Sequence, residues 1–376
     1  MNIWVIGKGI PKESNNMYGS FEFEQAQMLA RHGIKVVYIG LDFRPVHRWR
    51  KWGTSRSELG GMPAYELCLP IRPLPFIQNR LEFLFCKKLY EEIEKEQQTP
   101  DVIHVHFPAL RSYLVHALYQ KKGVKIVATE HWSQVQKKAV SKQYFDNLCW
   151  FARNADAFAC VGEPLKQSVK ELTQTEKPIM VIPNIINENF QYSKAAEDGK
   201  YKLLGVGRLV KGKRFDLMIS AFSKAYADNP NVTLKLVGGG EEYDRLSKQI
   251  KEYKLEDRVI LTGVKTREET AKEVAQCDAL ICASNFETFG VPVIEAWACG
   301  KPVIGTDALG FLEYMDDRLG CIVAANDEKQ MIDAMRQLYD KRDTFDGKWI
   351  SEFAFENFGE DAVTARICAL YNQITQ

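Results

Sequence analysis

Two glutamates, Glu287 and Glu295, stand eight residues apart on either side of a Gly-x-Pro step in the stretch NFETFGVPVIEAWACG. On one continuous helix their side chains would point roughly 80° apart, at about 100° per residue. Pro292, however, suits the first turn of a helix and is unfavourable in a helix interior. The stretch therefore predicts Glu287 in a loop and Glu295 one turn inside the helix that follows.

The backbone amides between these carboxylates would lie near the positive end of that helix, where anions bind. They belong to Phe289, Gly290 and Val291. The two carboxylates would then accept hydrogen bonds on either side of an anion site, which fits a ligand with hydroxyl groups flanking a phosphate. The plainer alternative is a helix N-terminal carboxylate and a surface residue that share no ligand.

A pair of cations follows a candidate strand in VGRLVKGKRFDLMISAF, residues 206–222. The strand ends at Gly207, and Arg208 and Lys213 come before the next helix. Two cations at a strand end, near a helix N-terminus, predict a diphosphate site. The alternative is that both are solvated loop charges.

The run GKG at 7–9 follows the first candidate strand and, with Asp42 after the second, partly matches a dinucleotide fingerprint. The full pattern needs a third glycine for close packing of the helix, and Lys12 stands there after Pro11. The long stretch IPKESNNMYGS comes next, whereas a dehydrogenase would turn directly into its helix. The pattern favours an extended loop at the strand end over an NAD site.

Short β-rich apolar runs alternate with helical patterns along nearly the whole chain, which predicts an α/β fold with parallel sheets. The expected strands of the first half are residues 2–7, 35–40, 101–106, 125–130, 157–162 and 179–184. Those of the second half are residues 202–207, 233–240, 258–263, 279–284, 302–307 and 320–325. Two such sets predict two doubly wound, Rossmann-like domains. Ligands bind at the carboxyl ends of such strands, so a central cleft is the expected site.

Composition narrows the function further. Of 376 residues, 45% are apolar and 26% are charged, as in an average soluble globular protein. The net charge is only +1, so the chain as a whole has no excess of positive charge that would favour binding to nucleic acid. No apolar run approaches the ~20 residues that cross a bilayer. The nine cysteines are scattered without a CxxC pair, which indicates a reduced, cytoplasmic setting. The segment RPVHRWRKWGTSR, residues 44–56, is either a solvated surface loop or a peripheral contact with an anionic membrane face.

Together these segments resemble the retaining glycosyltransferases of GT-B architecture in the large fourth sequence family, the glycosyl transferases group 1. Glu287 and Glu295 match the family's Glu-x7-Glu motif, with AWACGKPV after it, and VGRLVKGKRFD and LVGGGEEYDRL resemble its Gly-Arg-Leu and glycine-rich segments. The segments DVIHVHFP, TEHWS, ADAFACVGEPLKQSV, VIPNIIN and FENFGEDAVTARICALY follow in the family's order. The resemblance assigns residues 1–187 to an acceptor-side domain, 188–352 to a nucleotide-sugar-binding domain and 353–376 to a helix that crosses back.

By this resemblance, Glu295 accepts hydrogen bonds from the ribose hydroxyls of the nucleotide and Glu287 holds sugar hydroxyls. Arg208 and Lys213 neutralise the diphosphate as it leaves. The amides of residues 289–291 face the sugar and the diphosphate.

The resemblance extends to three further residues. His131, in TEHWS, would contact the donor sugar from the first domain. Gly19 stands where the family often has paired glycines and implies a phosphate contact there, and Gly238 belongs to the glycine-rich turn of the second domain. Thr288 replaces a common glycine, which would alter the sugar pocket.

The implied activity is transfer of a sugar, with retention, from a nucleotide diphosphate sugar to a hydroxyl of a sugar acceptor. UDP is the expected nucleotide. The segment GSFEFEQAQMLARHG resembles members that build bacterial capsular or other surface polysaccharides on a lipid-linked acceptor. Retention then implies front-face attack through an oxocarbenium-like transition state. No Asp-x-Asp occurs in the sequence, so neither a cofactor nor an essential metal is expected.

Three alternatives remain at this point. A nucleotide-sugar epimerase would keep the fold and convert the donor without an acceptor. An NAD-dependent oxidoreductase would rest on residues 7–9 and Asp42. A relative that binds but does not react would have to have lost activity although Glu287, Glu295 and Arg208 are in place.

Overall fold

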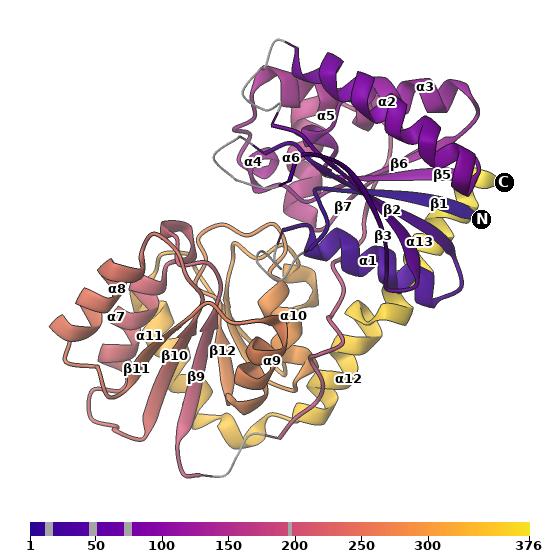
Figure 1. Ribbon diagram of the computed structural model, residues 1–376. Helices are drawn as coiled ribbons and strands as arrows, with labels where there is room; N and C mark the ends of the chain where they lie inside the picture. Colours follow the sequence, from indigo (N-terminus) through magenta and orange to yellow (C-terminus); the bar gives the residue numbers. More distant parts are fainter. Residues whose placement is uncertain (12–17, 45–50, 71–76, 195–197) are drawn as a thin grey trace. The chain divides into compact units, whose positions relative to one another are not determined.

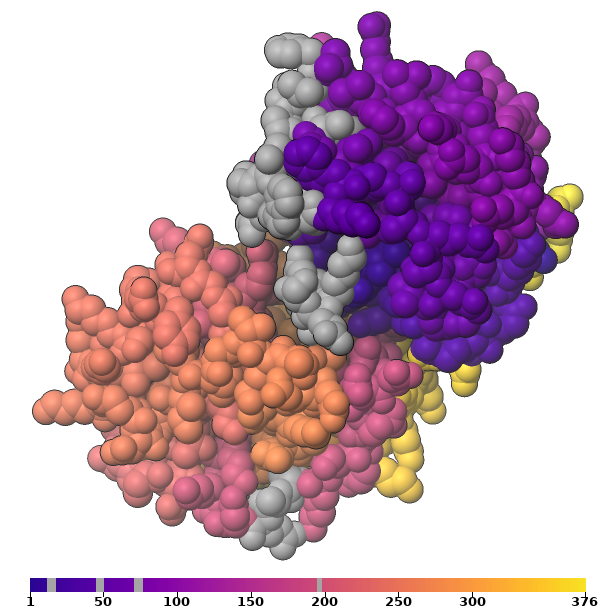
Figure 2. Space-filling view, viewed as in Figure 1, coloured from indigo at the N-terminus to yellow at the C-terminus, as the bar shows by residue number. Residues whose placement is uncertain are grey.

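The computed structural model divides into two compact units, each with its own sheet and core (Figure 1). Unit 1 comprises Met1–Ile185 and Val363–Gln376, and unit 2 comprises Ile186–Ala362. The described residues are 1–11, 18–44, 51–70, 77–194 and 198–376, and the others are grey in Figure 2. The chain therefore leaves unit 1 once and returns to it once.

The sheet of unit 1 has the strand order β3-β4-β2-β1-β5-β6-β7-β8. Its strands are β1 (Asn2–Gly7), β2 (Lys35–Asp42), β3 (Gly53–Leu59), β4 (Met62–Cys68), β5 (Val102–His106), β6 (Lys125–Glu130), β7 (Ala157–Cys160) and β8 (Ile179–Val181). All neighbours pair in parallel except β3 and β4. The chain runs outward in both directions from β1, which is the doubly wound topology that the alternation predicted.

The prediction of six strands in this half is wrong, because β3 and β4 form an additional edge hairpin. They join at Gly60 and Gly61, whose φ angles of 59° and 74° suit a tight turn. β3 is exposed along nearly its whole length and reads GTSRSEL, so it lacks the apolar run of a buried strand. Residues 53–56, predicted as part of a loop, lie in this strand.

Helices cover both faces of this sheet. They are α1 (Ser20–Arg31), α2 (Gln78–Gln97), η2 (Pro108–Leu110), α3 (Tyr113–Lys121), α4 (Ser133–Gln136), α5 (Lys142–Asn154), α6 (Glu163–Thr173) and α13 (Glu360–Thr375). α2 and α3 lie on one side, and α1 and α13 on the other (Figure 1).

Side chains of β1 alternate between these two layers. Ile3 and Val5 join the core cluster to which α1 and α13 contribute. Trp4 points the other way, and its ring packs against Tyr90 of α2 at 5.4 Å and Tyr119 of α3 at 5.9 Å between centroids. The central strand is thus buried on both faces, as a parallel strand must be.

The sheet of unit 2 has the order β11-β10-β9-β12-β13-β14, with every neighbouring pair parallel. Its strands are β9 (Tyr201–Val206), β10 (Val232–Val237), β11 (Val259–Gly263), β12 (Ala279–Ile281), β13 (Val303–Thr306) and β14 (Gly320–Val323). The six strands expected in this half are confirmed. The strand order again changes direction at β9, because β10 and β11 lie on one side of it and β12, β13 and β14 lie on the other.

Unit 2 also carries nine helical segments among its described residues. They are η3 (Lys211–Lys213), α7 (Phe215–Ala225), α8 (Tyr243–Glu252), α9 (Arg267–Gln276), α10 (Val291–Ala298), η4 (Leu312–Tyr314), α11 (Glu328–Asp340), η5 (Arg342–Thr344) and α12 (Gly347–Phe358). The helical pattern predicted over 353–376 is two helices, α12 and α13, separated at Gly359.

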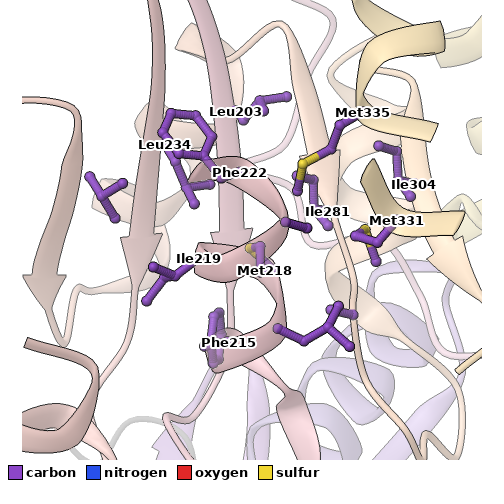
Figure 3. Close-up of a cluster of buried hydrophobic side chains, with 14 of the residues drawn as sticks. Leu203, Phe215, Met218, Ile219, Phe222, Leu234, Ile281, Ile304, Met331 and Met335 are labelled. Atoms are coloured by element: carbon purple, nitrogen blue, oxygen red, sulfur yellow. The ribbon is translucent and has the colours of Figure 1, made fainter. Parts of the chain in front are cut away.

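The core of unit 2 fixes α7 against the sheet (Figure 3). The buried residues of α7 include Phe215, Met218, Ile219 and Phe222, which follow a helical spacing. Around it lie Leu203 and Leu234 of the sheet, together with Met331 and Met335 of α11. Since α7 is held in this way, the loop between β9 and α7 is anchored at both ends.

Candidate functional site

The loop that follows β9 is fixed by close backbone contact with the end of β10. The Gly207 amide donates to the Val237 carbonyl at 3.0 Å. Gly238 has a φ of 143°, and a Cβ there would lie 1.8 Å from the Gly207 carbonyl oxygen. Only glycine fits position 238, so the glycine-rich turn holds the backbone that carries Arg208.

Arg208 lies directly after the end of β9, with its side chain exposed, as the sequence predicted. Its carbonyl accepts from the Val210 amide at 2.8 Å, which tightens the loop. Its charge also acts on Lys213, because it is one of the influences that lower the pKa of that amine. The two cations assigned to a diphosphate are therefore close enough to interact.

Lys213 and Glu287 form an ion pair, which the sequence did not predict as a contact. Burial disfavours the charge on Lys213, but Glu287 outweighs it, and the pKa of the amine is raised. The Ser284 hydroxyl donates to the same carboxylate oxygen at 3.3 Å. Lys213 and Ser284 thus hold the Glu287 carboxylate between the ends of β9 and β12.

The helix start predicted around Pro292 is confirmed. Gly290 precedes α10 with a φ of 113°, Val291 is the first helical residue and Pro292 lies in the first turn. Phe289 is buried and packs its ring against Phe311 at 4.8 Å, so only its backbone can face a ligand. These amides stand at the N-terminus of an eight-residue helix, beside Glu287 in the loop before it.

Glu295 is almost completely buried, with 2% of its side chain exposed, and pairs with Arg267. The Nη1 atom of Arg267 donates to Glu295 Oε1 at 2.5 Å, and the guanidinium lies 5.6 Å from the ring centroid of Phe190. Arg267 is the first residue of α9, whose start is set by a capping box between Thr266 and Glu269. A buried carboxylate needs an opposite charge as its partner. The signal that could have identified Arg267 in the sequence is a cation in the loop that follows a candidate strand.

These side chains converge at the topological switch point of unit 2. Arg208 and Lys213 follow β9, while Glu287 and α10 follow β12, the strand that pairs with β9. The loops after two adjacent strands that lead away in opposite directions leave a crevice at their carboxyl ends. The structure therefore brings Arg208, Lys213, Glu287 and the α10 amides together, with Glu295 and Arg267 beneath.

Unit 1 has its own switch point, between β1 and β5. Gly19 precedes α1 with a φ of 81°, and a Cβ there would lie 2.4 Å from the Gly9 carbonyl oxygen. The loop after β1 and the start of α1 are thus packed backbone to backbone. Lys8, which the sequence analysis did not single out, lies here with its amine 3.7 Å from the ring centroid of Phe107 after β5.

His131 belongs to a cluster of imidazoles at the carboxyl ends of β5 and β6. Its Nε2 lies 2.9 Å from Nδ1 of His106, and His104 stacks on His106 at 4.5 Å. Nδ1 of His104 is 2.6 Å from the Tyr371 hydroxyl of α13. Burial lowers the pKa of all three imidazoles, and that of His131 falls to about 3. The alternation in DVIHVHFP was the signal that His104 and His106 share a face.

Glu130, the last residue of β6, is another buried polar group that the sequence did not predict. Its carboxylate accepts from the amides of His131 at 2.8 Å, Trp132 at 2.9 Å and Ala109 at 3.2 Å. Burial raises the pKa of Glu130 to about 7, although these amides and Lys8 oppose the shift. The strand ends of β5 and β6 therefore carry neutral imidazoles and a carboxyl whose pKa is about 7, with the charge of Lys8 close to that carboxyl.

The carboxylate that an NAD site would need for a ribose is already engaged. Arg44 Nη2 lies 2.7 Å from Asp42 Oδ2, and the guanidinium stacks 3.8 Å from the ring centroid of Tyr18. Of the basic segment 44–56, residues 45–50 lie outside the described part of the chain, and so does Lys12.

The described residues offer neither a metal site nor a membrane span. No group of three or more His, Cys, Asp or Glu side chains in the described ranges could hold a metal ion. None of the helices seen there is long and apolar enough to span a bilayer.

Two family descriptions match the chain side by side. Residues 187–350 match Glycosyl transferases group 1, and residues 23–190 match Glycosyltransferase Family 4. The first match takes in the switch point of unit 2, and the second takes in β5 and His131 but begins after β1, Lys8 and Gly19.

Several individual proteins are also similar to this chain. N-acetyl-alpha-D-glucosaminyl L-malate synthase of Bacillus anthracis is 24% identical over 93% of this chain and 92% of its own. A Campylobacter jejuni protein, N-acetylgalactosamine-N,N'-diacetylbacillosaminyl-diphospho-undecaprenol 4-alpha-N-acetylgalactosaminyltransferase, is 32% identical over 46% of this chain and 48% of its own. The crystal structure of Anabaena HepE in complex with UDP and glucose aligns with a TM-score of 0.75 at 17% identity, over 99% of this chain and 100% of that one. The fold is thus the GT-B fold.

Proposed function

Because this chain belongs to the group 1 glycosyltransferases, which use nucleotide sugars, we propose that it transfers a sugar from a UDP-sugar to an acceptor hydroxyl with retention of configuration. One observation carries the proposal. The ion pair of Lys213 and Glu287 joins the loops after β9 and β12 beside the N-terminus of α10, with Arg208 adjacent. Cations, amides and a carboxylate acceptor are what a sugar diphosphate requires.

In this proposal the diphosphate lies between Arg208, Lys213 and the amides of residues 289–291. These donors are in place before the reaction, so they can stabilise the charge that develops on the departing phosphate. Two protein cations can do this without a divalent ion, and we propose a metal-independent transfer. Glu295 accepts from the ribose hydroxyls, and Arg267 supplies the opposite charge that its buried carboxylate needs.

Glu287 serves the sugar rather than the bond-making step. Its carboxylate is engaged by Lys213 and Ser284, which suits an acceptor of sugar hydroxyls more than a free nucleophile. The acceptor oxygen then bonds to the anomeric carbon on the face from which the phosphate oxygen leaves. The acceptor proton passes to that phosphate oxygen, and the diphosphate carries away the electron pair of the broken bond.

The acceptor we propose is a lipid-linked sugar. The Campylobacter jejuni relative is named for a diphospho-undecaprenol substrate, and it supports this choice. A second candidate is a small hydroxy acid, because the Bacillus anthracis relative, which aligns over nearly the whole chain, is named for L-malate. Product analysis with one donor and both acceptors separates the two, and conversion of the donor with neither would indicate an epimerase.

Calorimetric titration with UDP in EDTA tests the donor site directly. We expect micromolar binding that is lost in Glu295→Ala. Lys211→Ala is a matched control, since Lys211 is an exposed cation of the same loop. Binding that needs added Mg²⁺ would contradict the metal-independent site. Binding of GDP or ADP in place of UDP would overturn the choice of nucleotide.

A further inference from the structure

We propose that the amino-terminal half of α2 docks unit 1 on an anionic membrane surface. This inference rests on the proposed function, because a lipid-linked acceptor is reached at a bilayer. Three large apolar side chains are exposed here, namely Ile77 by 44%, Leu84 by 59% and Phe85 by 41%. Grouped exposed apolar side chains on one helix mark an interaction surface, whereas single ones need no explanation.

Helical geometry places these side chains on one outward stripe. At about 100° per residue, Ile77, Leu81 and Leu84 fall within about 60° of one another, with Phe85 beside them. The opposite face is already used in the core by Cys86, Leu89, Tyr90 and Ile93. In the first half of α2 the buried face carries Gln78 and Glu82 as well as Cys86, so the large apolar side chains of this half lie on the exposed stripe, where core packing does not account for them.

Charge along α2 is divided between its two halves. Arg80, Lys87 and Lys88 border the exposed stripe, and no acidic residue lies in the first turn. Glu82, near them, is buried and accepts from the Ser112 amide at 2.9 Å, and Glu91 Oε1 lies 3.7 Å from the Lys87 amine. The acids of the helix follow in its second half, at residues 91–96. An apolar stripe edged by Lys and Arg suits the headgroup region of an anionic bilayer.

The position of α2 in unit 1 would bring a bound membrane close to the carboxyl ends of the strands. The helix begins at Gln78, shortly after the carboxyl end of β4 at Cys68. Trp52, 47% exposed, stands at the same edge, because the next residue, Gly53, pairs with Cys68 at the end of β4. The ends of β1 and β6, with Lys8 and His131, belong to this edge as well, since these strands are parallel to β4. A bilayer held there presents a lipid-linked sugar to the strand ends.

Vesicle cosedimentation of the full chain tests the surface. The probes are phosphatidylcholine vesicles with and without phosphatidylglycerol, and the variants are Leu84→Asp and Phe85→Asp. We expect binding to the anionic vesicles that weakens about tenfold or more in either variant, from the loss of one inserted side chain. Arg80→Gln with Lys88→Gln should reduce the preference for phosphatidylglycerol. Leu312→Asp, at a side chain of unit 2 that is 39% exposed, is the matched control and should bind as the parent does.

The outcomes separate this proposal from the proposed function. UDP titration of the same variants should give unchanged affinity, and hydrogen-exchange protection of unit 1 equal to that of the parent would show that unit 1 folds in them. Equal vesicle binding by Leu84→Asp and the parent would overturn the membrane surface and leave the donor site standing. A concentration-dependent dimer that Leu84→Asp abolishes, without vesicle binding by the parent, would assign the stripe to a second copy of the chain and overturn the proposal as well. Vesicle binding without UDP binding would overturn the proposed function alone.

Discussion

The two units share a doubly wound topology, but their switch points carry different kinds of polar group. All six histidines of the chain precede residue 186, and those at the strand ends of unit 1 have lowered pKa values. Unit 2 has no histidine and uses the ion pairs Lys213–Glu287 and Arg267–Glu295. One scaffold thus supports a site with a cluster of neutral imidazoles beside Lys8 and a site built from ion pairs.

The difference lies in how each unit tolerates burial of polar groups. A buried charge needs an opposite charge or loses its ionisation. Unit 2 takes the first course, with a guanidinium against Glu295. Unit 1 takes the second, since its imidazoles are neutral and the pKa of Glu130 rises to about 7. A charged site fits an anionic diphosphate, and a neutral one fits a sugar, which is the division of labour that the proposed function needs.

The largest effect should come from removing the guanidinium of Arg267. In Arg267→Met the buried Glu295 loses this cation, and the protein should lose about 3 kcal/mol of stability in thermal or urea denaturation. UDP binding should weaken as well, because the carboxylate assigned to the ribose loses the partner that holds it. Adding Glu295→Gln should restore stability without restoring UDP binding. Unaltered stability and unaltered UDP binding in the single variant would contradict the pairing.

Arg208→Ala tests whether unit 2 uses its charges on the reaction. We expect kcat/KM to fall by ~10²–10³, the cost of one preorganised charge-stabilising donor. Glu295→Ala should instead act mainly on the KM for the donor. Lys211→Ala is the control, with a cation of the same loop removed. A change under threefold in Arg208→Ala would remove it from the diphosphate site.

Lowering the pH should destabilise unit 1 more than unit 2, without any mutation. The pKa of His131 is about 3 and that of His116 about 4 in the folded protein, against 6.5 for a free imidazole. Their contribution is present above pH 6.5 and is lost as pH falls towards 4, by about 2 kcal/mol per histidine at pH 5. Glu130, with its raised pKa, acts in the opposite direction between pH 7 and 4.5 but is one group against several.

Hydrogen exchange read separately for each unit measures this difference. Protection of unit 1 should fall between pH 6.5 and pH 5 after correction for intrinsic exchange rates, while that of unit 2 should change less. His131→Asn should flatten part of the dependence in unit 1. Equal losses in both units would show that the imidazoles do not govern acid stability.

The smallest effect is expected at the end of the imidazole cluster. Tyr371→Phe removes the hydroxyl that lies 2.6 Å from His104 Nδ1 and should cost about 1 kcal/mol in urea denaturation. Tyr253→Phe, at an exposed tyrosine of unit 2, should cost nothing measurable. Equal stabilities of the two variants would mean that α13 is held by apolar packing alone.

Local rules were sufficient for the parts of the site that one segment determines. Pro292 placed the start of α10, and with it the positions of Glu287 and Glu295, because proline excludes itself from helix interiors. The apolar strands of unit 2 were predictable for a similar reason, since a strand buried on both faces reads as an apolar run.

Contacts between distant segments were not predictable in this way. The pairing of Lys213 with Glu287 joins residues 74 positions apart, and that of Arg267 with Glu295 joins residues 28 apart. Which cation reaches a carboxylate depends on how the strand-end loops pack. β3 was missed for a different reason, because an exposed edge strand has no need of an apolar pattern.

The return of α13 to unit 1 has a consequence for how the chain folds during synthesis. Val363, Ile367, Leu370 and Tyr371 complete the core cluster that contains Ile3 and Val5. Residues 1–185 leave the ribosome first, yet their core must wait for the segment made after unit 2. Unit 2 is contiguous and can fold as soon as residue 362 has emerged. The unit that is translated first is therefore expected to be the last to become stable, and until then its apolar surface depends on chaperones for protection.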